Sequence, residues 1–398
     1  MMIRRLSLEI NEMIVSQLLH DKASIASCAL VSRNWNCFVR HRLFETVQVK
    51  ETAEGFCAFM EFLEASPHIL PRIRTLGLIG KHPRQTSSLC VHVLACILSR
   101  LPNLREASLT DVKIPSHCSC ASSWCPEELF VNLEHLHLSR IWFTSPKAVV
   151  DFFALFSELD RLSLHHCGWM DVSFAGTRDA LMKGLLSRLR LHSLQMDYFF
   201  LNTLEHFLCE FLSRTRSTGT LHTATVSFYD YDAVTAFGKL LPDVCPNIRH
   251  LRLHLPMENA PNDKETRILS SRLDIRYLLL TKPVHWDIDF DPLALVREIL
   301  EDVSSTLRSL TLRLRCYTYC DVSSVLAGLE YNMHWGALSE ILYQFTELKV
   351  LSLEFERDRF WPADLDNDSC RDLVEANIPN FLKQGVFRCS FAKGGLDL

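Results

Sequence analysis

The sequence predicts an α/β protein with a small N-terminal module of three helices, followed by a repeat solenoid that contains a curved parallel sheet. Three observations predict this architecture. The chain has 398 residues, more than one compact core of ordinary size accommodates. Three short helical patterns occupy residues 1–47, and a hexapeptide pattern rich in leucine then recurs along 73–398. Residues 48–72 are expected to join the two parts as a strand and then a helix.

Composition and charge restrict the classes of partner. Hydrophobic residues make up 48% of the chain and charged residues 22%, as in folded globular proteins. The net charge is −5, and residues 1–50 carry seven Lys or Arg and four Asp or Glu, a balance of +3, so the remainder carries −8. An acidic body without a run of Lys or Arg argues against nucleic acid as a partner, because such binding needs clustered cations.

The cysteines and the hydropathy pattern bear on the compartment. Several of the 15 cysteines, such as Cys28, Cys96 and Cys209, lie inside apolar stretches, which is typical of buried free thiols. The N-terminal residues lack the continuous apolar core of a signal peptide, and no run of 18 apolar residues predicts a membrane span. We therefore expect a reducing compartment, cytoplasm or nucleus or both, and no membrane partner.

The N-terminal module is predicted from helical spacing of apolar residues and from capping residues at the start of each segment. Three such helices in about 40 residues bury little apolar surface by themselves, so we expect a partner surface to cover part of the module. The expected caps and apolar positions are Ser7 with Ile10, Met13, Ile14 and Leu18; Asp21 with Ile25, Cys28, Ala29 and Leu30; and Ser32 or Asn34 with Trp35, Phe38 and Val39.

Residues 6–47 resemble an F-box. The stretch "LSLEINEMIVSQLL" is followed by "LVSRNW" and then by a basic segment that ends in Leu43 and Phe44, as in that family. Ser7 stands where the family usually has proline. The resemblance implies that Trp35 and the flanking Leu-Val pair pack the helical bundle, and that the basic positions are solvated or near a partner. The alternative from the residues alone is a helical cap that seals the end of the repeat array.

The resemblance, which is to F-box proteins of the fungal type, also implies a function. The chain would be a substrate-recognition subunit of an SCF-type cullin–RING ubiquitin ligase, without catalysis or cofactor of its own, and would bring an unknown target protein close to the conjugating enzyme. The alternative is an interaction scaffold whose F-box-like helices only cap the solenoid. The residues expected to bind the ligase adaptor are Leu6, Leu8, Ile10, Ile14, Leu18, Leu30, Val31 and Trp35.

The body carries the pattern L-x-x-L-x-L, with some loose matches, at spacings between 26 and 41 residues. A period near 30 favours a divergent leucine-rich repeat over the longer, purely helical repeats. Ten recurrences argue against the alternative, in which the pattern marks amphipathic helices. The matches begin at Ile73, Leu104, Leu133, Leu159, Leu191, Leu221, Ile248, Ile275, Leu307 and Leu348.

Stretches with helical spacing lie between these predicted strands, at 91–101, 148–159, 204–214, 293–300 and 338–345. A strand, turn and helix repeated in this way predicts a parallel-sheet solenoid. The Asn or Cys that follows the last motif leucine in leucine-rich repeats is kept only by Cys167. Polar segments at 115–128, 257–267 and 360–370 interrupt the rhythm and are expected to be loops that contribute to binding.

The third and fifth residues of each motif should point away from the core, because strand side chains alternate between faces. We expect this surface, the concave face of the solenoid, to hold the target protein, and its His and Arg residues to suit an acidic or phosphorylated segment. The alternative is an ordinary solvated surface. The candidate residues are His135, His137, Arg161, His165, His250, Arg252, His254, Tyr277 and Arg313, with Glu354 on the same face.

Other chemistry has weaker support. His117, Cys118, Cys120 and Cys125 form one cluster, but structural zinc sites usually combine two paired motifs, so we expect free thiols there and no metal, a local disulfide being the other alternative. The chain lacks the glycine-rich phosphate-binding and nucleophile-elbow motifs. A distant Cys–His or Ser–His pair remains as the hydrolase alternative.

Overall fold

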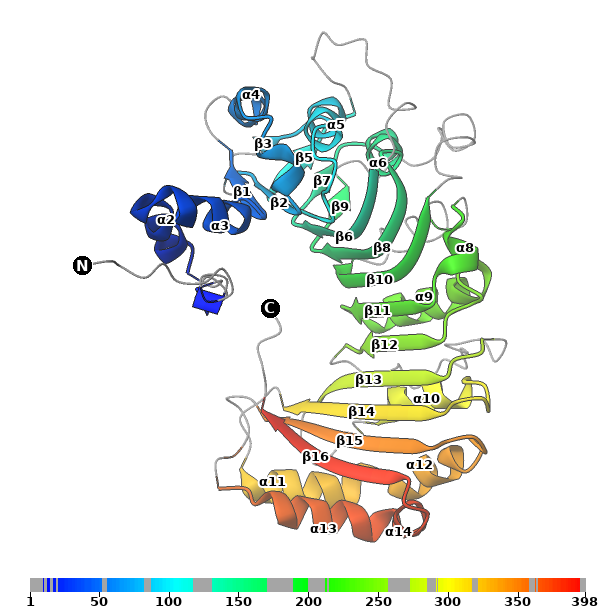
Figure 1. The fold of residues 1–398 in the computed structure, drawn as a ribbon. Coiled ribbons are helices and arrows are strands. Elements are labelled where there is room, and N and C mark those ends of the chain that lie inside the picture. Colours follow the sequence, from blue (N-terminus) through cyan, green and yellow to red (C-terminus); the bar gives the residue numbers. More distant parts are fainter. Residues whose placement is uncertain are drawn as a thin grey trace, which may run out of the picture. The chain divides into compact units, whose positions relative to one another are not determined.

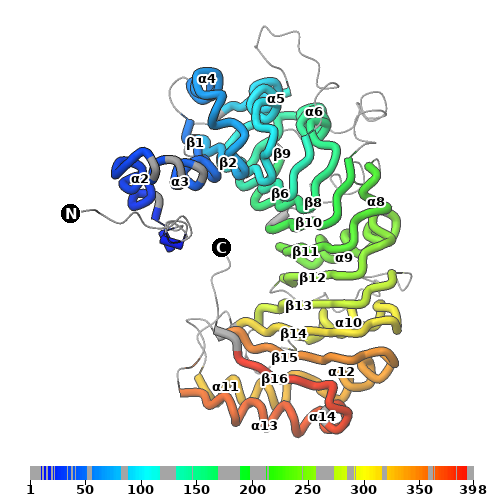
Figure 2. The backbone as a smooth tube through the Cα atoms, in the orientation of Figure 1, coloured from blue at the N-terminus to red at the C-terminus, as the bar shows by residue number. Residues whose placement is uncertain are grey.

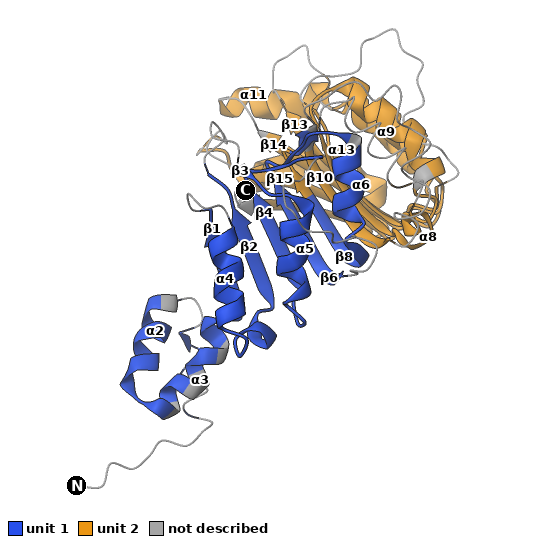
Figure 3. Ribbon diagram, turned by 90° about the horizontal axis from the view of Figure 1, so that it is seen from above, with its two compact units in different colours: residues 1–163, 167–185 blue, residues 164–166, 186–398 orange. Residues whose placement is uncertain are grey.

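The computed structural model describes residues 10, 13–14, 17–18, 21–51, 56–81, 87–116, 131–169, 189–199, 212, 215–256, 273–284, 291, 293–316, 321–357, 362 and 364–393. The chain forms two compact units, coloured separately in Figure 3. Unit 1 comprises 1–163 and 167–185, and unit 2 comprises 164–166 and 186–398.

Two capped helices begin the described part of unit 1. Helix α2 (Lys22–Val31) starts at Asp21, whose carboxylate accepts a hydrogen bond from the Ser24 amide at 3.1 Å. Helix α3 (Arg33–Leu43) starts at Ser32, whose hydroxyl accepts from the Trp35 amide at 3.3 Å. Both caps agree with the prediction. Ile10, Met13, Ile14 and Gln17 are also helical, but the rest of the predicted first helix lies outside the described residues.

The main strands of unit 1 are parallel and follow chain order: β1 (Thr46–Lys50), β2 (Thr75–Ile79), β4 (Glu106–Thr110), β6 (Val131–Ser139) and β8 (Phe156–His165). Helices α4 (Cys57–Ala65), α5 (Val91–Ser99) and α6 (Pro146–Phe153) and the short 3-10 helix η1 (Leu70–Arg72) connect them, and Figure 1 shows α4, α5 and α6 beside these strands. The predicted connection at 48–72 contains the end of β1, which begins at Thr46, and the whole of α4. The helical pattern at 148–159 is wrong in its second half, because β8 begins at Phe156 and continues the parallel ladder.

A second, small sheet also belongs to unit 1 and was not predicted. It contains β3 (Ser87–Ser88), β5 (Val112–Ile114), β7 (Trp142–Phe143) and β9 (Gly168–Trp169). The residue after each of β4, β6 and β8 has a left-handed backbone, with φ of 57° at Asp111, 52° at Arg140 and 50° at His166. This conformation turns the chain from a main strand into the next short strand. Gly168 is required there, since a Cβ atom would lie 2.8 Å from the Trp142 ring.

The strands of unit 2 also follow chain order, as the trace in Figure 2 shows. They are β10 (Arg190–Phe199), β11 (Thr223–Phe228), β12 (His250–His254), β13 (Tyr277–Val284), β14 (Ser309–Cys316), β15 (Val350–Arg357) and β16 (Phe387–Lys393). The intervening helices are α8 (Ser217–Thr220), α9 (Tyr231–Val244), α10 (Ala294–Glu301), α11 (Val322–Ala327), the π-helical turn η6 (Gly328–Asn332), α12 (Trp335–Leu342), α13 (Asn367–Asn377) and α14 (Pro379–Lys383).

The motif register is confirmed by burial. In β6, β12 and β14 the fourth and sixth motif residues are almost fully buried, for example Leu136 and Leu138 at 0% exposure, while the residues between them are partly or fully exposed. The protein is thus a mixed α/β fold with a large parallel sheet, twelve strands in the described residues. Within the described part of the chain, no helix is long and apolar enough to cross a membrane.

Candidate functional site

The helices α2 and α3 pack around a small core of their own. Ile25 and Val39 are buried, and Trp35 packs against them together with Leu18, Cys28, Ala29 and Leu43. The expectation that Trp35 packs the bundle is therefore confirmed. Because this core also contains Leu18, two of the residues assigned to adaptor binding contribute to the packing of the module itself.

The Leu-Val pair at the end of α2 does not pack inside. Leu30 is 88% exposed and Val31 71% exposed, so the expectation that they fill the bundle is wrong. The buried face of α2 carries Ile25, Cys28 and Ala29 at helical spacing, and this leaves the last two residues on the opposite side. Ile10, Met13 and Ile14 are exposed as well, whereas Leu6 and Leu8 lie outside the described residues. We call Ile10, Met13, Ile14, Leu30 and Val31 together the exposed apolar residues of the module.

The outer strand residues of unit 1 include a pair of histidines on β6. His135 contacts the Ser163 hydroxyl through Nε2 at 2.9 Å, and its ring meets that of His137 edge-on, with centroids 6.3 Å apart. Arg161 is exposed. All three candidates lie on the predicted face.

In unit 2, His165 and Asp197 form a hydrogen-bonded pair that the sequence did not predict. His165 Nδ1 lies 2.5 Å from one Asp197 oxygen, and the Ser227 hydroxyl donates to the other at 2.8 Å. Burial acts to raise the pKa of Asp197, but hydrogen bonds from His165 and Ser227 outweigh it and lower this pKa. The carboxylate lies between the hydroxyl and the imidazole. This order does not activate Ser227, because a nucleophilic serine needs the imidazole next to it.

Arg313 and Arg315 on β14 are paired with the neighbouring strand. Arg313 lies 2.8 Å from Glu354, and Arg315 makes two bonds to Glu356, at 2.8 and 2.5 Å. Glu354 thus neutralises the charge of Arg313, a residue that was expected to bind the target. His254 is half-buried near both arginines. Its burial lowers its pKa, and the two arginines act in the same direction.

Among the predicted residues of unit 2, His250 and Tyr277 form an exposed stack. The two rings lie on adjacent strands, with centroids 4.3 Å apart and planes within 4°. Arg252 is exposed two residues beyond His250. Burial lowers the pKa of His250, and the charges of Arg252 and Arg249 lower it further. Three of the predicted residues, His250, Arg252 and Tyr277, are thus together and open to solvent.

The second residues of the unit 2 motifs lie side by side along one edge of the sheet, and the sequence did not reveal this arrangement. In unit 2 the second motif residue is basic in six successive strands, and backbone N–H groups link each one to the carbonyl of the one before at 2.8–3.1 Å. We call these residues the basic row: His192, His222, Arg249, Arg276, Arg308 and Lys349. They are 27 to 41 residues apart in sequence, so no cluster of cations is visible until the strands align.

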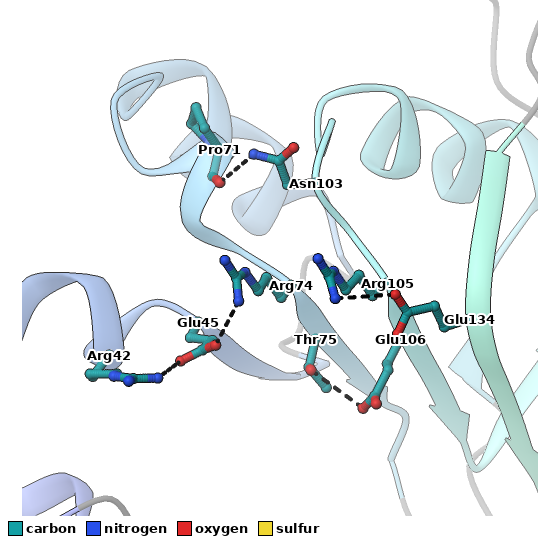
Figure 4. A network of polar contacts seen from close by, with 9 residues as sticks. All are labelled: Arg42, Glu45, Pro71, Arg74, Thr75, Asn103, Arg105, Glu106 and Glu134. Atoms are coloured by element: carbon teal, nitrogen blue, oxygen red, sulfur yellow. Dashed lines mark hydrogen bonds and ion pairs between the residues drawn. The ribbon is translucent and has the colours of Figure 1, made fainter. Parts of the chain in front are cut away.

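The same motif position in unit 1 is mixed in charge. Arg74 pairs with Glu45 at 3.5 Å, and Arg105 pairs with Glu134 at 3.2 Å, as Figure 4 shows. Backbone bonds align Glu45, Arg74, Arg105 and Glu134 in the same way as the basic row. The two acidic and two basic residues cancel along this edge, so the concentration of positive charge is a property of unit 2.

The described residues contain no group of three or more His, Cys, Asp or Glu side chains placed to hold a metal ion. The cluster of His117, Cys118, Cys120 and Cys125 lies outside them. No protein-family model matches the chain, and a search of curated proteins finds no match either. The exposed residues of the module and of the strands are therefore interpreted from their own chemistry.

Proposed function

We propose that this protein is a substrate receptor of an SCF-type cullin–RING ubiquitin ligase, with an F-box-like module at residues 1–47 and a leucine-rich-repeat-like solenoid at 73–398. The module binds the ligase adaptor, and the solenoid holds the target protein. The chain needs no catalytic residue for this role, since it acts by raising the concentration of target lysines near the conjugating enzyme.

The observation that carries the proposal is the set of exposed apolar residues on a module whose described part already contains a buried core. Leu30 and Val31 are exposed at the end of α2, whereas Ile25 of the same helix and Val39 of α3 are buried. Two adjacent exposed aliphatic residues, with Ile10, Met13 and Ile14 exposed nearby in sequence, have the character of an interface that a partner covers. The F-box resemblance supplies the adaptor as that partner.

The test is co-expression of the full chain with the ligase adaptor, followed by size-exclusion chromatography. The wild type should co-elute with the adaptor, and the double variant Leu30→Asp with Val31→Asp should elute alone. Both side chains are exposed, so the variant should keep its folded core. The matched control is Tyr331→Asp, because Tyr331 is 69% exposed but lies in η6 of unit 2. It should co-elute like the wild type.

The second candidate is an interaction scaffold whose N-terminal helices only cap the solenoid. Ser7, in place of the family's proline, favours it. The same experiment separates the two functions. A stable wild-type chain that elutes without the adaptor contradicts the ligase proposal and leaves the scaffold.

A further inference from the structure

The basic row of unit 2 is a continuous structural feature. Its six residues occupy one register position, and parallel strands lie about 4.8 Å apart, so the row extends for roughly 24 Å. His222, Arg249 and Lys349 are exposed, while the other three are partly exposed. An extended peptide of about seven residues, at about 3.3 Å each, has the same length.

The positive charge of this edge is only partly neutralised within the fold. Arg276 pairs with Asp274 at 3.0 Å, and Arg308 pairs with Glu347 at 3.2 Å. Within the part of the chain that the structure describes, Arg249 and Arg252 have no ion-pair partner within 4.0 Å. Counting Arg249, Arg252, Arg276, Arg308 and Lys349 against Asp274 and Glu347 leaves a local charge of 5 − 2 = +3 in an otherwise acidic body.

The behaviour of two neighbouring titratable groups agrees with a positive local potential. Burial, followed by the charges of Arg252 and Arg249, lowers the pKa of His250. The pKa of Asp274 is also lowered, first by its hydrogen bond from Arg276 and further by the charge of Arg249. Burial of His250 and the Arg276 hydrogen bond to Asp274 are the larger causes, and the charge of Arg249 adds to both shifts in the direction that a positive local charge predicts.

We propose that the basic row, with the adjacent His250–Tyr277 stack, binds a short extended acidic segment of a partner protein, with several Asp or Glu residues within about seven positions. The arginines supply charge-assisted hydrogen bonds to carboxylates, and the flat stacked rings provide an apolar surface for the stems of those side chains. This inference refines the target-binding half of the proposed function by stating the chemistry of the target.

A protein segment fits this surface better than a nucleic acid does. A polyanionic strand gains most of its affinity from cations along many phosphates, and the chain beyond residue 50 carries −8 in total. A short acidic peptide interacts only with the local +3 edge, since charges farther than about 10 Å are screened at ordinary salt. A nucleic acid is therefore kept as an outcome of the test.

The experiment measures fluorescence anisotropy of a labelled ten-residue peptide of Glu and Gly against the full chain, at low and at physiological salt. The comparison peptide replaces Glu with Gln. We expect binding of the Glu peptide only, weakening as salt rises. The variant Arg249→Glu with Arg252→Glu should reduce the affinity by roughly tenfold or more. The matched control is Arg105→Glu, which changes an exposed arginine at the same motif position of unit 1 and should bind the peptide unchanged.

Three outcomes overturn the proposal. Equal binding of the Gln peptide removes the role of charge, and equal loss in Arg105→Glu removes the assignment to the basic row. Tighter binding of a labelled oligothymidine than of the Glu peptide assigns the surface to single-stranded nucleic acid. Circular dichroism and a thermal melt of each variant exclude unfolding as the cause. The adaptor is absent from this assay, so its result and that of the co-elution experiment can fail independently.

Discussion

Arg315 on β14 donates two hydrogen bonds to the carboxylate of Glu356 on β15, and the Glu356 side chain is only 8% exposed. The neighbouring pair, Arg313 with Glu354, joins the same two strands but is more open, with side chains 31% and 23% exposed. The two pairs therefore differ mainly in how much water screens them.

This difference predicts unequal effects of two matched substitutions. Glu356→Gln takes the charge partner of Arg315 from a poorly hydrated site and should lower the free energy of unfolding by about 1–3 kcal/mol. Glu354→Gln should lower it by less than about 1 kcal/mol, as for solvated pairs. Urea denaturation of both variants measures the difference. Equal losses would contradict the role assigned to burial.

The half-buried His254 predicts a stability that depends on pH. Burial, Arg315 and Arg313 lower its pKa below the ordinary 6.5, although Asp197 and Glu356 act in the opposite direction. Between the lowered pKa and 6.5 the unfolded chain binds a proton that the folded chain does not, so stability falls as the pH drops through 6.5.

His254→Gln removes this proton uptake. Urea midpoints at about pH 7.5 and about pH 5 should therefore differ less for the variant than for the wild type. The control is His68→Gln, a change of an exposed histidine in unit 1, which should leave the wild-type difference intact. The same pH dependence in all three proteins would show that His254 is not its source.

The cysteines should differ strongly in reactivity. Burial raises the pKa of Cys245 to about 12, and burial with the charge of Asp366 raises that of Cys370 to about 11. Cys57 is exposed. Since the thiolate is the reactive form, iodoacetamide at about pH 8 should label Cys57 well before the other two, as followed by peptide mass spectrometry. Simultaneous labelling in the native protein would contradict this order; labelling in urea is the control for intrinsic reactivity.

The core of the N-terminal module predicts a local loss of structure. Trp35→Ala removes an aromatic side chain that packs on Ile25 and Val39, and should cost about 2–4 kcal/mol. Hydrogen exchange followed by mass spectrometry should show loss of protection in α2 and α3 with little change in β14 and β15. Leu30→Ala, which shortens an exposed side chain, should leave the protection of α2 and α3 unchanged. Equal loss in both variants would refute the packing role of Trp35.

The strand positions could be predicted because every repeat carries the same local pattern of buried residues. Ile73, Leu133 and Ile248 begin motifs whose buried positions the structure confirms. The last strand, β16, was not predicted, since 387–393 contains no such motif; it is ordered by pairing with β15. The cysteine pattern was a weaker guide, because Cys28 and Cys96 are only partly buried.

The small second sheet could not be predicted from the same rules. Left-handed backbones usually indicate Gly or Asn, but here Asp111, Arg140 and His166 adopt them. Arg140 also pairs with Asp111 at 2.5 Å, so neighbouring repeats stabilise each other's turns. The basic row could not be predicted for a related reason. Its residues become neighbours only through strand register, which links positions some 30 residues apart.

Within each unit, every main strand pairs with the strands that precede and follow it along the chain. A strand that leaves the ribosome therefore meets a partner that has already been synthesised, and no early strand must wait for a distant one. Ordering of this kind lowers the entropy cost of each pairing step and allows a unit to assemble progressively during translation. A nascent chain that pauses between repeats would expose one sheet edge at a time, which limits the surface available for aggregation.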